Sequence, residues 1–246
     1  MSFKDKIDTK KLPQHVAVIM DGNGRWARKQ GRLRTFGHKH GVEAVRDTVT
    51  ASAELGIKYL TLYAFSTENW NRPKLEVDAL MNLLVSTLGK ELKTLTKNKI
   101  RLLAIGDLEN LPKKCYNELQ ETIDKTKNND RMTLILSLSY SSRWELTRMT
   151  KLIATEVKNG QLNIDQINQE LISNYLTTKE IPDPELLIRT SNELRVSNFL
   201  LWQIAYSELY FTETLWPDFR RDHLYEAIVE FQKRERRFGK VISHES

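Results

Sequence analysis

Residues 15–31, HVAVIMDGNGRWARKQG, place an acid, two glycines and several basic side chains directly after an apolar run. Gly22 and Gly24 allow the backbone to turn sharply and approach a ligand closely, and N–H groups exposed in such a turn suit phosphate oxygens. Four arginines and a histidine follow closely, at Arg25, Arg28, Arg32, Arg34 and His38. The pattern is typical of a cradle for a diphosphate.

Asp21 lies inside this cationic segment, although a carboxylate on its own repels phosphate. The pairing makes chemical sense when a divalent cation, most simply Mg²⁺, sits between Asp21 and the anion. The alternative is structural: Asp21 caps the next helix, and the arginines form a solvated face. This segment alone leaves both interpretations open.

Three better-known phosphate motifs do not fit these letters. A Walker A loop needs G-x-x-x-x-G-K-[ST], which GNGRWARKQG lacks. A phosphatase of the haloacid-dehalogenase type would show strand–Asp-x-Asp, but Asn23 occupies the second acidic position. The dinucleotide fingerprint G-x-G-x-x-G fails because Ala27 stands where its third glycine belongs.

Two further polar clusters follow later apolar runs. The first, residues 64–73 (AFSTENWNRP), contains a tryptophan inside a polar loop, which favours a functional role over ordinary loop polarity. The second, residues 189–211 (RTSNELRVSNFLLWQIAYSELYF), offers another anion site at Arg189, Arg195 and Ser197. Glu208 is an acid within its apolar part, and buried acids are seldom unpaired, so a salt bridge to one of these arginines is the structural alternative.

The elements that must position these clusters are read from the apolar pattern. Short apolar runs alternate with longer helix-like segments, which predicts an α/β fold with a mostly parallel sheet covered by helices. In such sheets ligands bind at the carboxyl ends of the strands, where Asp21 follows the first run. The runs lie at residues 15–20, 57–65, 100–105, 132–138 and 186–188.

Three helices are expected from periodicity and end signals. The clearest follows Pro73, with apolar side chains on one face, and another begins near Gly41 and ends at Gly56. The stretch 220–237, RRDHLYEAIVEFQKRERR, predicts a strongly charged helix that is solvated or faces a partner. The apolar face after Pro73 consists of Val77, Leu80, Met81, Leu84, Leu88, Leu92 and Leu95.

Length and composition bound the remaining choices. The 246 residues are 40% hydrophobic, which suits one domain over residues 15–246, including the charged helix, after a tail at 1–14. Cys115 is the single cysteine, and no run suits a signal peptide or a bilayer span, so a cytoplasmic protein is expected. The net charge of +6 favours an anionic partner without choosing among nucleic acid, lipid headgroup and diphosphate.

Five ordered segments now carry a resemblance to a known family. Together with the long apolar helix, the anion sites suggest a substrate with a charged head and an apolar tail. The chain resembles the cis-prenyltransferases, in particular the bacterial enzymes that make undecaprenyl diphosphate, from about His15 to Gly239. The segments are HVAVIMDGNGRWA, GHKHGVEAVR, LYAFSTENWNRP, PDPELLIRTS and SNFLLWQIAYSELYF with LWPDF.

The resemblance implies a fold and an activity. The fold is a central parallel sheet flanked by helices around an elongated apolar cleft, unlike the all-helical trans-prenyltransferases, whose DDxxD motif this sequence lacks. The activity is Mg²⁺-dependent condensation of isopentenyl diphosphate onto an allylic diphosphate, farnesyl diphosphate, giving a long-chain polyprenyl diphosphate for cell-wall glycan synthesis. A homodimer is implied, with no nucleic acid partner and only peripheral contact with the inner face of a membrane, through the product.

The resemblance also assigns residues by position. Asp21 corresponds to the essential aspartate that holds Mg²⁺, Glu208 to a second metal ligand that the family receives from the partner's side of the dimer, and Asn69 to the proton acceptor. The isopentenyl diphosphate site corresponds to Arg189, Arg195, Val196 and Ser197. The allylic diphosphate site corresponds to Gly22, Asn23, Gly24, Arg25, Trp26, Arg34, His38, Ser66, Thr67, Glu68, Trp70 and Arg72.

The sequence departs from the family pattern at three places. His40 replaces a usual alanine, Ser141-Ser142 replaces a usual glycine pair, and Asn192 replaces the glycine of the RTSGE motif. Asparagine tolerates positive φ, whereas the two serines would reshape the turn if it needs positive φ there.

On the helix after Pro73, Ala79 is the small residue expected to face the cleft, so that enlarging it shortens the product.

Two other classes of function compete with the enzyme. An RNA-binding protein could use the basic surface and the five tryptophans, but no RNP-like strand or KH-type loop is visible, and acids sit at each anion site. A non-catalytic subunit related to the same family is the second alternative. The retention of Asp21, Arg25, Arg195 and Glu208 argues against it.

Overall fold

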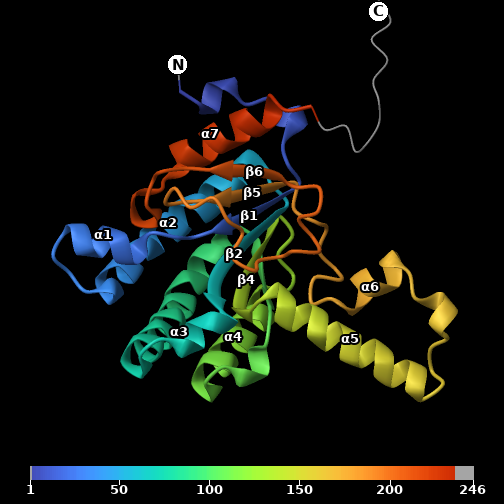
Figure 1. Cartoon of the computed structure of the whole chain (residues 1–246). Helices are drawn as coiled ribbons and strands as arrows, with labels where there is room; N and C mark the ends of the chain where they lie inside the picture. The colour runs from blue at the N-terminus through green and yellow to red at the C-terminus, as the bar shows by residue number, and fades with distance from the viewer. Residues whose placement is uncertain (1, 236–246) are drawn as a thin grey trace, which may run out of the picture.

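The computed structural model describes residues 2–235. Its centre is one sheet of six strands in the order β3-β4-β2-β1-β5-β6, and every neighbouring pair is parallel (Figure 1). The predicted α/β sheet is therefore confirmed, and it is parallel throughout. The strands are β1 (His15–Ile19), β2 (Tyr59–Ser66), β3 (Ile100–Ile105), β4 (Met132–Tyr140), β5 (Leu186–Arg189) and β6 (Glu208–Phe211).

The strand β1 lies inside the sheet and is buried at all five positions. Its sequence HVAVI carries apolar residues on both faces, as expected where helices cover a parallel sheet on both sides. All five apolar runs form strands as predicted. The sixth strand, β6, forms the end of the 189–211 stretch, where the sequence showed only the acid Glu208 among apolar and aromatic residues.

Within residues 2–235, seven α-helices connect or cover the strands, and α2 and α3 pack on the same side of the sheet (Figure 1). The helix α2 begins earlier than predicted, so that Gly37 and Gly41 lie inside it. A Cβ on Gly37 would lie 2.0 Å from the backbone oxygen of Asn23, and one on Gly41 would lie 2.5 Å from the Asn23 side chain. The absence of a side chain at these two glycines therefore lets the segment after Asp21 pack closely against α2. The helices are α1 (Asn23–Lys29), α2 (Arg34–Leu55), α3 (Lys74–Lys97), α4 (Lys113–Thr126), α5 (Ser142–Lys158), α6 (Gln169–Tyr175) and α7 (Arg221–Gln232).

The amphipathic helix predicted after Pro73 is confirmed as α3, with Val77, Met81, Leu88 and Leu95 buried. The prediction of a solvated or partner-facing C-terminal helix is wrong for α7. Its apolar residues form a buried face against the main core, and the charges that dominate its sequence lie mostly on the other face or near its ends. The buried set is Leu224, Tyr225, Ala227, Ile228, Val229 and Phe231. The last predicted residues of this helix, 236 and 237, lie outside the described part.

The segment before β1 packs on the body of the protein. Phe3, Ile7 and Leu12 contact the main core, and the Gln232 side chain donates hydrogen bonds to the backbone oxygens of Asp8 and Lys11. The division between residues 14 and 15 stays a prediction. Across residues 2–235, no helix has both the length and the apolar character needed to cross a bilayer.

A buried histidine begins the central strand. His15 is 2% exposed, its Nδ1 lies 2.6 Å from the Pro182 oxygen, and its Nε2 lies 2.7 Å from the Thr61 hydroxyl. A neutral ring satisfies both contacts by donating to the carbonyl and accepting from the hydroxyl. Burial lowers the pKa of His15 to about 4, and the Pro182 contact opposes this only in part.

This histidine should make the protein less stable in mild acid. The unfolded chain takes up the proton below pH 6.5, but the folded chain resists it until about pH 4, so stability is full above this window and is lost within it. From pH 7 to pH 5, His15 should cost roughly 2 kcal/mol of unfolding free energy. Urea unfolding at the two pH values should show a clearly smaller loss for His15→Asn. Equal losses in the two proteins would contradict the assignment.

Candidate active site

The carboxyl ends of β1, β2 and β5 bring the three polar clusters of the sequence to one edge of the sheet. Ile19 of β1 is in register with Arg189 of β5, so the residues that follow both strands are neighbours. Arg189 Nη2 donates to Asp21 Oδ2 over 3.0 Å. The two predicted anion sites therefore meet at one carboxylate.

Asp21 does not cap the following helix. The N-cap of α1 is Gly22, and no side chain satisfies that cap. Asp21 Oδ1 instead accepts the Gly22 N–H at 2.6 Å, while Oδ2 accepts from Arg189 and, at 3.4 Å, from Arg25. The structural alternative for Asp21 is therefore wrong, and its carboxylate stays about one-third exposed.

The backbone at Asp21 is fixed from both sides. The Thr190 hydroxyl accepts the Asp21 N–H at 2.9 Å and lies 2.6 Å from the Asp21 carbonyl oxygen, to which it can donate. The same carbonyl accepts the Trp216 N–H at 3.0 Å. The sequence analysis missed Thr190, whose place directly after Arg189 was the one available signal.

The glycine turn has the conformation expected of a cradle. Gly22 has φ of +108°, and a Cβ there would also lie 3.0 Å from Leu215. A Cβ on Gly24 would lie 2.9 Å from Nε of Arg34. The first glycine permits the left-handed turn, and the second lets the Arg34 side chain approach the start of α1.

Three carboxylates each hold two arginines at this edge. Asp21 binds Arg25 and Arg189, Glu193 binds Arg25 at 3.0 Å and also Arg195, and Glu76 lies 3.2 Å from Arg72 and 3.5 Å from Arg34. The cluster thus contains five arginines against three carboxylates. The excess positive charge suits an anionic ligand, which can replace these carboxylates as partner of the guanidinium groups.

Glu76 and Glu193 were not among the predicted site residues. Each stands close in sequence to an arginine that it binds: Glu76 four residues after Arg72, and Glu193 two residues before Arg195. An acid beside an anion-binding arginine was therefore the available signal. The role of each glutamate in the cluster depends on its second arginine, which comes from a distant segment of the chain in both cases.

The loop after β2 forms a short 3₁₀ turn over Thr67–Asn71. Asn69 Oδ1 accepts the Ser66 N–H at 3.2 Å, so this atom is engaged in the turn. The Trp70 indole donates to Ser139 Oγ at 2.9 Å and packs edge-on against Phe65. Trp70 thus anchors the loop to β4.

The same loop is tied to the segments after β4 and β5. The Thr67 hydroxyl donates to Ser141 Oγ at 2.8 Å, and the Asn198 side-chain amide donates to Glu68 at 2.8 Å. The contact between Asn198 and Glu68 places the polar cluster of residues 64–73 directly beside that of residues 189–211.

The segment after β5 is held by Arg189, which is 3% exposed. Its Nη1 donates to the Arg195 backbone oxygen and, at 2.6 Å, to Ser197 Oγ. Backbone strain concentrates here in five non-glycine residues with positive φ, which is a feature common in functional loops. They are Ser191, Asn192, Ser197, Asn198 and Leu200.

The departures from the family pattern are accommodated locally. Asn192 has φ of +55°, so asparagine keeps the left-handed turn. Neither Ser141 nor Ser142 has positive φ, and the positive φ lies at Ser139 instead. Ser142 Oγ accepts the Leu201 N–H at 2.7 Å, and His40 stacks near Trp26 with ring centroids 4.9 Å apart.

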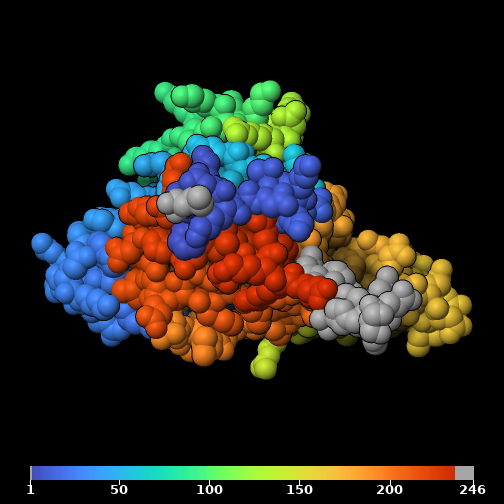
Figure 2. Space-filling model, turned by 90° about the horizontal axis from the view of Figure 1, so that it is seen from above, coloured from blue at the N-terminus to red at the C-terminus, as the bar shows by residue number. Residues whose placement is uncertain are grey.

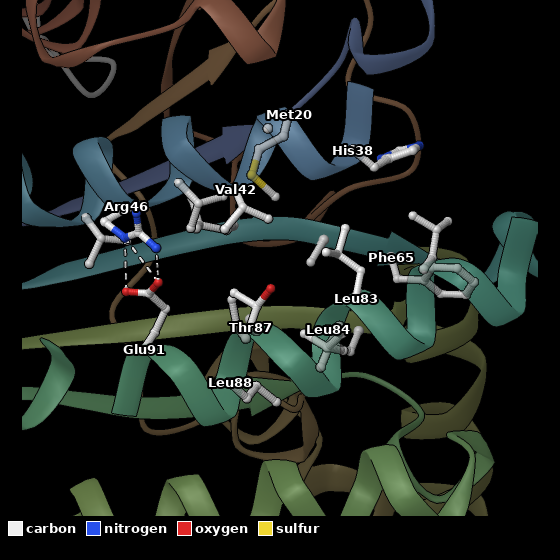
Figure 3. Close-up of a pocket in the computed structure, with 18 of the residues that line it drawn as sticks. Met20, His38, Val42, Arg46, Phe65, Leu83, Leu84, Thr87, Leu88 and Glu91 are labelled. Atoms are coloured by element: carbon white, nitrogen blue, oxygen red, sulfur yellow. Dashed lines mark hydrogen bonds and ion pairs between the residues drawn. The ribbon is translucent and has the colours of Figure 1, made fainter. Parts of the chain in front are cut away.

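An apolar cavity of about 250 Å³ opens beside the charged cluster, between α2, α3 and the sheet (Figure 3). His38 and Phe65 lie at one end in this view, and the ion pair of Arg46 with Glu91 lies at the other. This confirms the elongated apolar cleft. Its walls include Val42, Val45 and Val49 of α2, Leu80, Leu84 and Leu88 of α3, and Leu62, Leu134 and Leu136 of the sheet.

Ala79 is not among the residues that line this cavity, so the expectation that it faces the cleft is wrong. The helix α3 turns its 80, 83, 84, 87 and 88 positions inward, and position 79 falls on a neighbouring stripe. Thr87 is a small inward residue, and it points into the cavity in Figure 3.

His38 lies where the cavity meets the charged cluster. Burial, together with the charges of Arg72 and Arg34, lowers the pKa of His38 to about 4. Its ring is therefore neutral at neutral pH and can act as a hydrogen-bond partner without adding charge. Nε2 of His38 is buried and has no partner in the described structure, as is true of Oδ1 of Asn23.

Glu208 lies apart from the cluster within this chain. It begins β6 in register with Leu186, at the opposite end of the strands from Arg189. Its carboxylate accepts from Arg234 at 2.8 Å. The predicted salt bridge from Glu208 to one of the arginines at 189 and 195 is therefore wrong, because its partner is Arg234, just after the end of α7.

Trp26 and Val196 also contribute differently from the charged side chains. The Trp26 indole donates to Asp218 at 2.7 Å and stacks on Phe36. Val196 packs against the second core cluster. Over the described residues, no three His, Cys, Asp or Glu side chains gather in a way that would hold a metal ion by themselves.

This fold and site define a class of protein with an arginine-rich sheet edge beside an apolar cleft, suited to a substrate with an anionic head and an apolar tail. Residues 19–239 match the prenyltransferase family model described as "Putative undecaprenyl diphosphate synthase". The chain belongs to this family.

Individual relatives agree with the family match. The chain is 56% identical over 230 residues to an isoprenyl transferase of Chlorobaculum tepidum, covering 94% of this chain and 87% of that protein. It is 51% identical to the farnesyl-diphosphate-specific ditrans,polycis-undecaprenyl-diphosphate synthase of Pasteurella multocida, covering 95% and 98% of the two chains.

A solved structure agrees with the fold. Lavandulyl diphosphate synthase of Lavandula x intermedia, crystallised with dimethylallyl diphosphate, superimposes with a TM-score of 0.91 at 36% identity, covering 93% of this chain and 99% of that one.

Proposed function

We propose that this protein is a cis-prenyltransferase that adds isopentenyl diphosphate units to farnesyl diphosphate and makes a long-chain polyprenyl diphosphate, undecaprenyl diphosphate. The observation that carries the proposal is the arginine cluster around Asp21 at the mouth of an apolar cavity. A charged head and a long apolar tail are the substrate features that such a site binds together. The names of the relatives support the choice of substrates and product.

The allylic diphosphate is assigned to the Asp21 side of the cluster. The N–H groups of the glycine turn at the start of α1 suit phosphate oxygens. Arg34 and Arg72 give up Glu76 to bind the anion, and neutral His38 can hydrogen-bond to it. The apolar tail then follows the cavity between α2 and α3.

Isopentenyl diphosphate is assigned to Arg189, Arg195, Val196 and Ser197. The Arg195 side chain is 62% exposed and pairs with Glu193. Because most of it lies in solvent, it can leave Glu193 and turn toward an incoming anion. Because Arg189 touches both Asp21 and the Arg195 loop, the two diphosphates would bind as neighbours. Holding two reactants in one orientation is a large part of such catalysis.

The residues around Asp21 suit Mg²⁺. Magnesium in proteins is commonly bound through one or two carboxylates plus substrate phosphates, and Asp21 Oδ1 makes one hydrogen bond, leaving a lone pair. Asp21 would hold the ion, which when bound neutralises charge on the departing diphosphate. Glu208 would serve only as the partner subunit's Glu208 in a homodimer, because its own chain places it at the far end of the strands.

The protein's own side chains have defined roles in the condensation. The arginines stabilise negative charge as the allylic C–O bond breaks, and the double bond of isopentenyl diphosphate attacks that carbon. The loss of a proton then sets the new cis double bond. An amide is a poor base, and Asn69 Oδ1 already accepts the Ser66 N–H, so Asn69 orients the group that takes the proton, a phosphate oxygen or water.

The proposal is tested by incubating the pure protein with labelled isopentenyl diphosphate, farnesyl diphosphate and Mg²⁺ and chromatographing the products. A long-chain polyprenyl diphosphate is expected, and EDTA should abolish its formation. Asp21→Asn should lose far more turnover than affinity for farnesyl diphosphate, because Asp21 acts on the leaving group. Asp78→Asn, on the exposed side of α3, is the matched control. Full turnover in metal-free buffer would refute the metal assignment.

The two anion sites should separate in steady-state kinetics. Losing one charge-assisted arginine contact should cost on the order of 1.5–3 kcal/mol, or roughly 10- to 150-fold in apparent affinity. Arg195→Ala should raise KM for isopentenyl diphosphate alone, and Arg34→Ala should weaken farnesyl diphosphate alone. The exposed Arg148→Ala controls for lost positive charge. If both site variants weakened the same substrate, the two-site assignment would be wrong.

The cavity should limit product length. Thr87→Phe adds bulk to the inner wall of α3, so elongation should stop early while the first condensation continues. Product chromatography should show shorter chains for Thr87→Phe and the wild-type length for Ser86→Phe, which adds the same ring on the exposed side of α3. Ala79→Phe should also keep the wild-type length. A wild-type distribution for Thr87→Phe would show that the growing chain does not pass this point.

A further inference from the structure

Two leucines project into solvent at the entrance to the site. Leu33 is 80% exposed and Leu75 is 85% exposed, the highest values among the large apolar residues of the described chain. Each directly precedes one partner of the ion pair between Arg34 and Glu76, whose atoms lie 3.5 Å apart. The two leucines therefore flank a single contact between the starts of α2 and α3.

The surface around Leu33 is strongly basic. The stretch from residue 22 to residue 42 contains six lysines and arginines and no acid. Arg25 and Arg34 are held by carboxylates of the site. The other four, together with Lys74 beside Leu75, are exposed and form no ion pair within the described residues; these four are Arg28, Lys29, Arg32 and Lys39.

This patch stands out from the body of the protein. The helix α1 and the turn that leads into α2 project beyond the sheet at the left of Figure 1, and the same segment forms a blue lobe at the left edge of Figure 2. His38, four residues after Arg34 on α2, lines the cavity. The patch therefore lies at the rim of the cavity's charged mouth.

The combination favours one kind of partner. Single exposed leucines are ordinary in proteins. Two leucines that are almost fully exposed, beside basic side chains without ion-pair partners, match a surface with apolar chains under anionic headgroups. The core of a protein interface is instead depleted of charged residues, and lysine in particular is rare there. Charge complementarity thus favours an anionic bilayer.

We propose that Leu33 and Leu75, with Arg28, Lys29 and Arg32, dock this protein on an anionic lipid surface. The leucines enter the headgroup boundary, and the basic side chains bind lipid phosphates. The cavity mouth then faces the bilayer, so an apolar product passes into lipid without crossing water. The purpose of docking rests on the proposed function, but the docking itself requires no catalysis.

The test is sedimentation of the ligand-free protein with vesicles. Wild type should bind phosphatidylglycerol vesicles, should bind phosphatidylcholine vesicles weakly, and should be released by salt. The double variant Leu33→Ser/Leu75→Ser should lose about tenfold or more in partition coefficient. Ile164→Ser, at an isoleucine that is 67% exposed and outside the patch, is the matched control and should bind as wild type.

Charge and assembly provide two further comparisons. Arg28→Gln/Lys29→Gln should weaken binding to anionic vesicles and reduce its salt dependence. Wild-type binding by the leucine variant would overturn the proposal. So would a smaller molar mass for that variant in size-exclusion chromatography with light scattering, because the patch would then be an interface between copies of the chain.

Failure of docking is distinguishable from failure of the proposed function. Vesicle binding without product in the condensation assay would contradict the enzymatic assignment and leave the docking surface in place. Product formation in detergent without vesicle binding would contradict the docking surface and leave the enzymatic assignment in place.

Discussion

The ion pair between Asp21 and Arg189 is the contact on which the rest of the site depends. It joins the ends of β1 and β5 over 3.0 Å, and Arg189 is almost fully buried. A guanidinium group withdrawn from water is costly unless it is paired and fully hydrogen-bonded. The same side chain holds the Arg195 oxygen and Ser197, so the loop after β5 takes its shape from this one contact.

The other arginines of the site are also held by carboxylates. Glu76 and Glu193 each bind two of them, which keeps the guanidinium groups close to one another despite their mutual repulsion. An anion that displaces these carboxylates meets donors already gathered at one edge, so less orientation entropy is lost on binding. We infer that the diphosphates replace these carboxylates as partners of the arginines during turnover.

The charged mouth and the apolar cavity are built by different parts of the chain. The charges come from α1, from the loops after β2 and β5 and from the first turns of α2 and α3, whereas later turns of α2 and α3 and the sheet supply the apolar walls. Under the proposed function, substitutions in these later turns of α3 would change product length and leave the diphosphate contacts in place. His38 stands at the boundary, where burial and nearby arginines keep its ring neutral.

The sequence by itself determined the parallel α/β sheet, the turn at Gly22 and Gly24 and the family, because strand runs, turn glycines and motif spacing are local signals. It failed where the answer depended on distant neighbours. The many charges of α7 obscured its apolar, buried face. Ala79 was assigned to the cleft-facing side of α3 in error, because a helix pattern does not say which side meets the cleft. Only the tertiary structure brought Arg189 to Asp21 and placed Glu208 at the far end of the sheet, because strand order and register decide which chain ends meet.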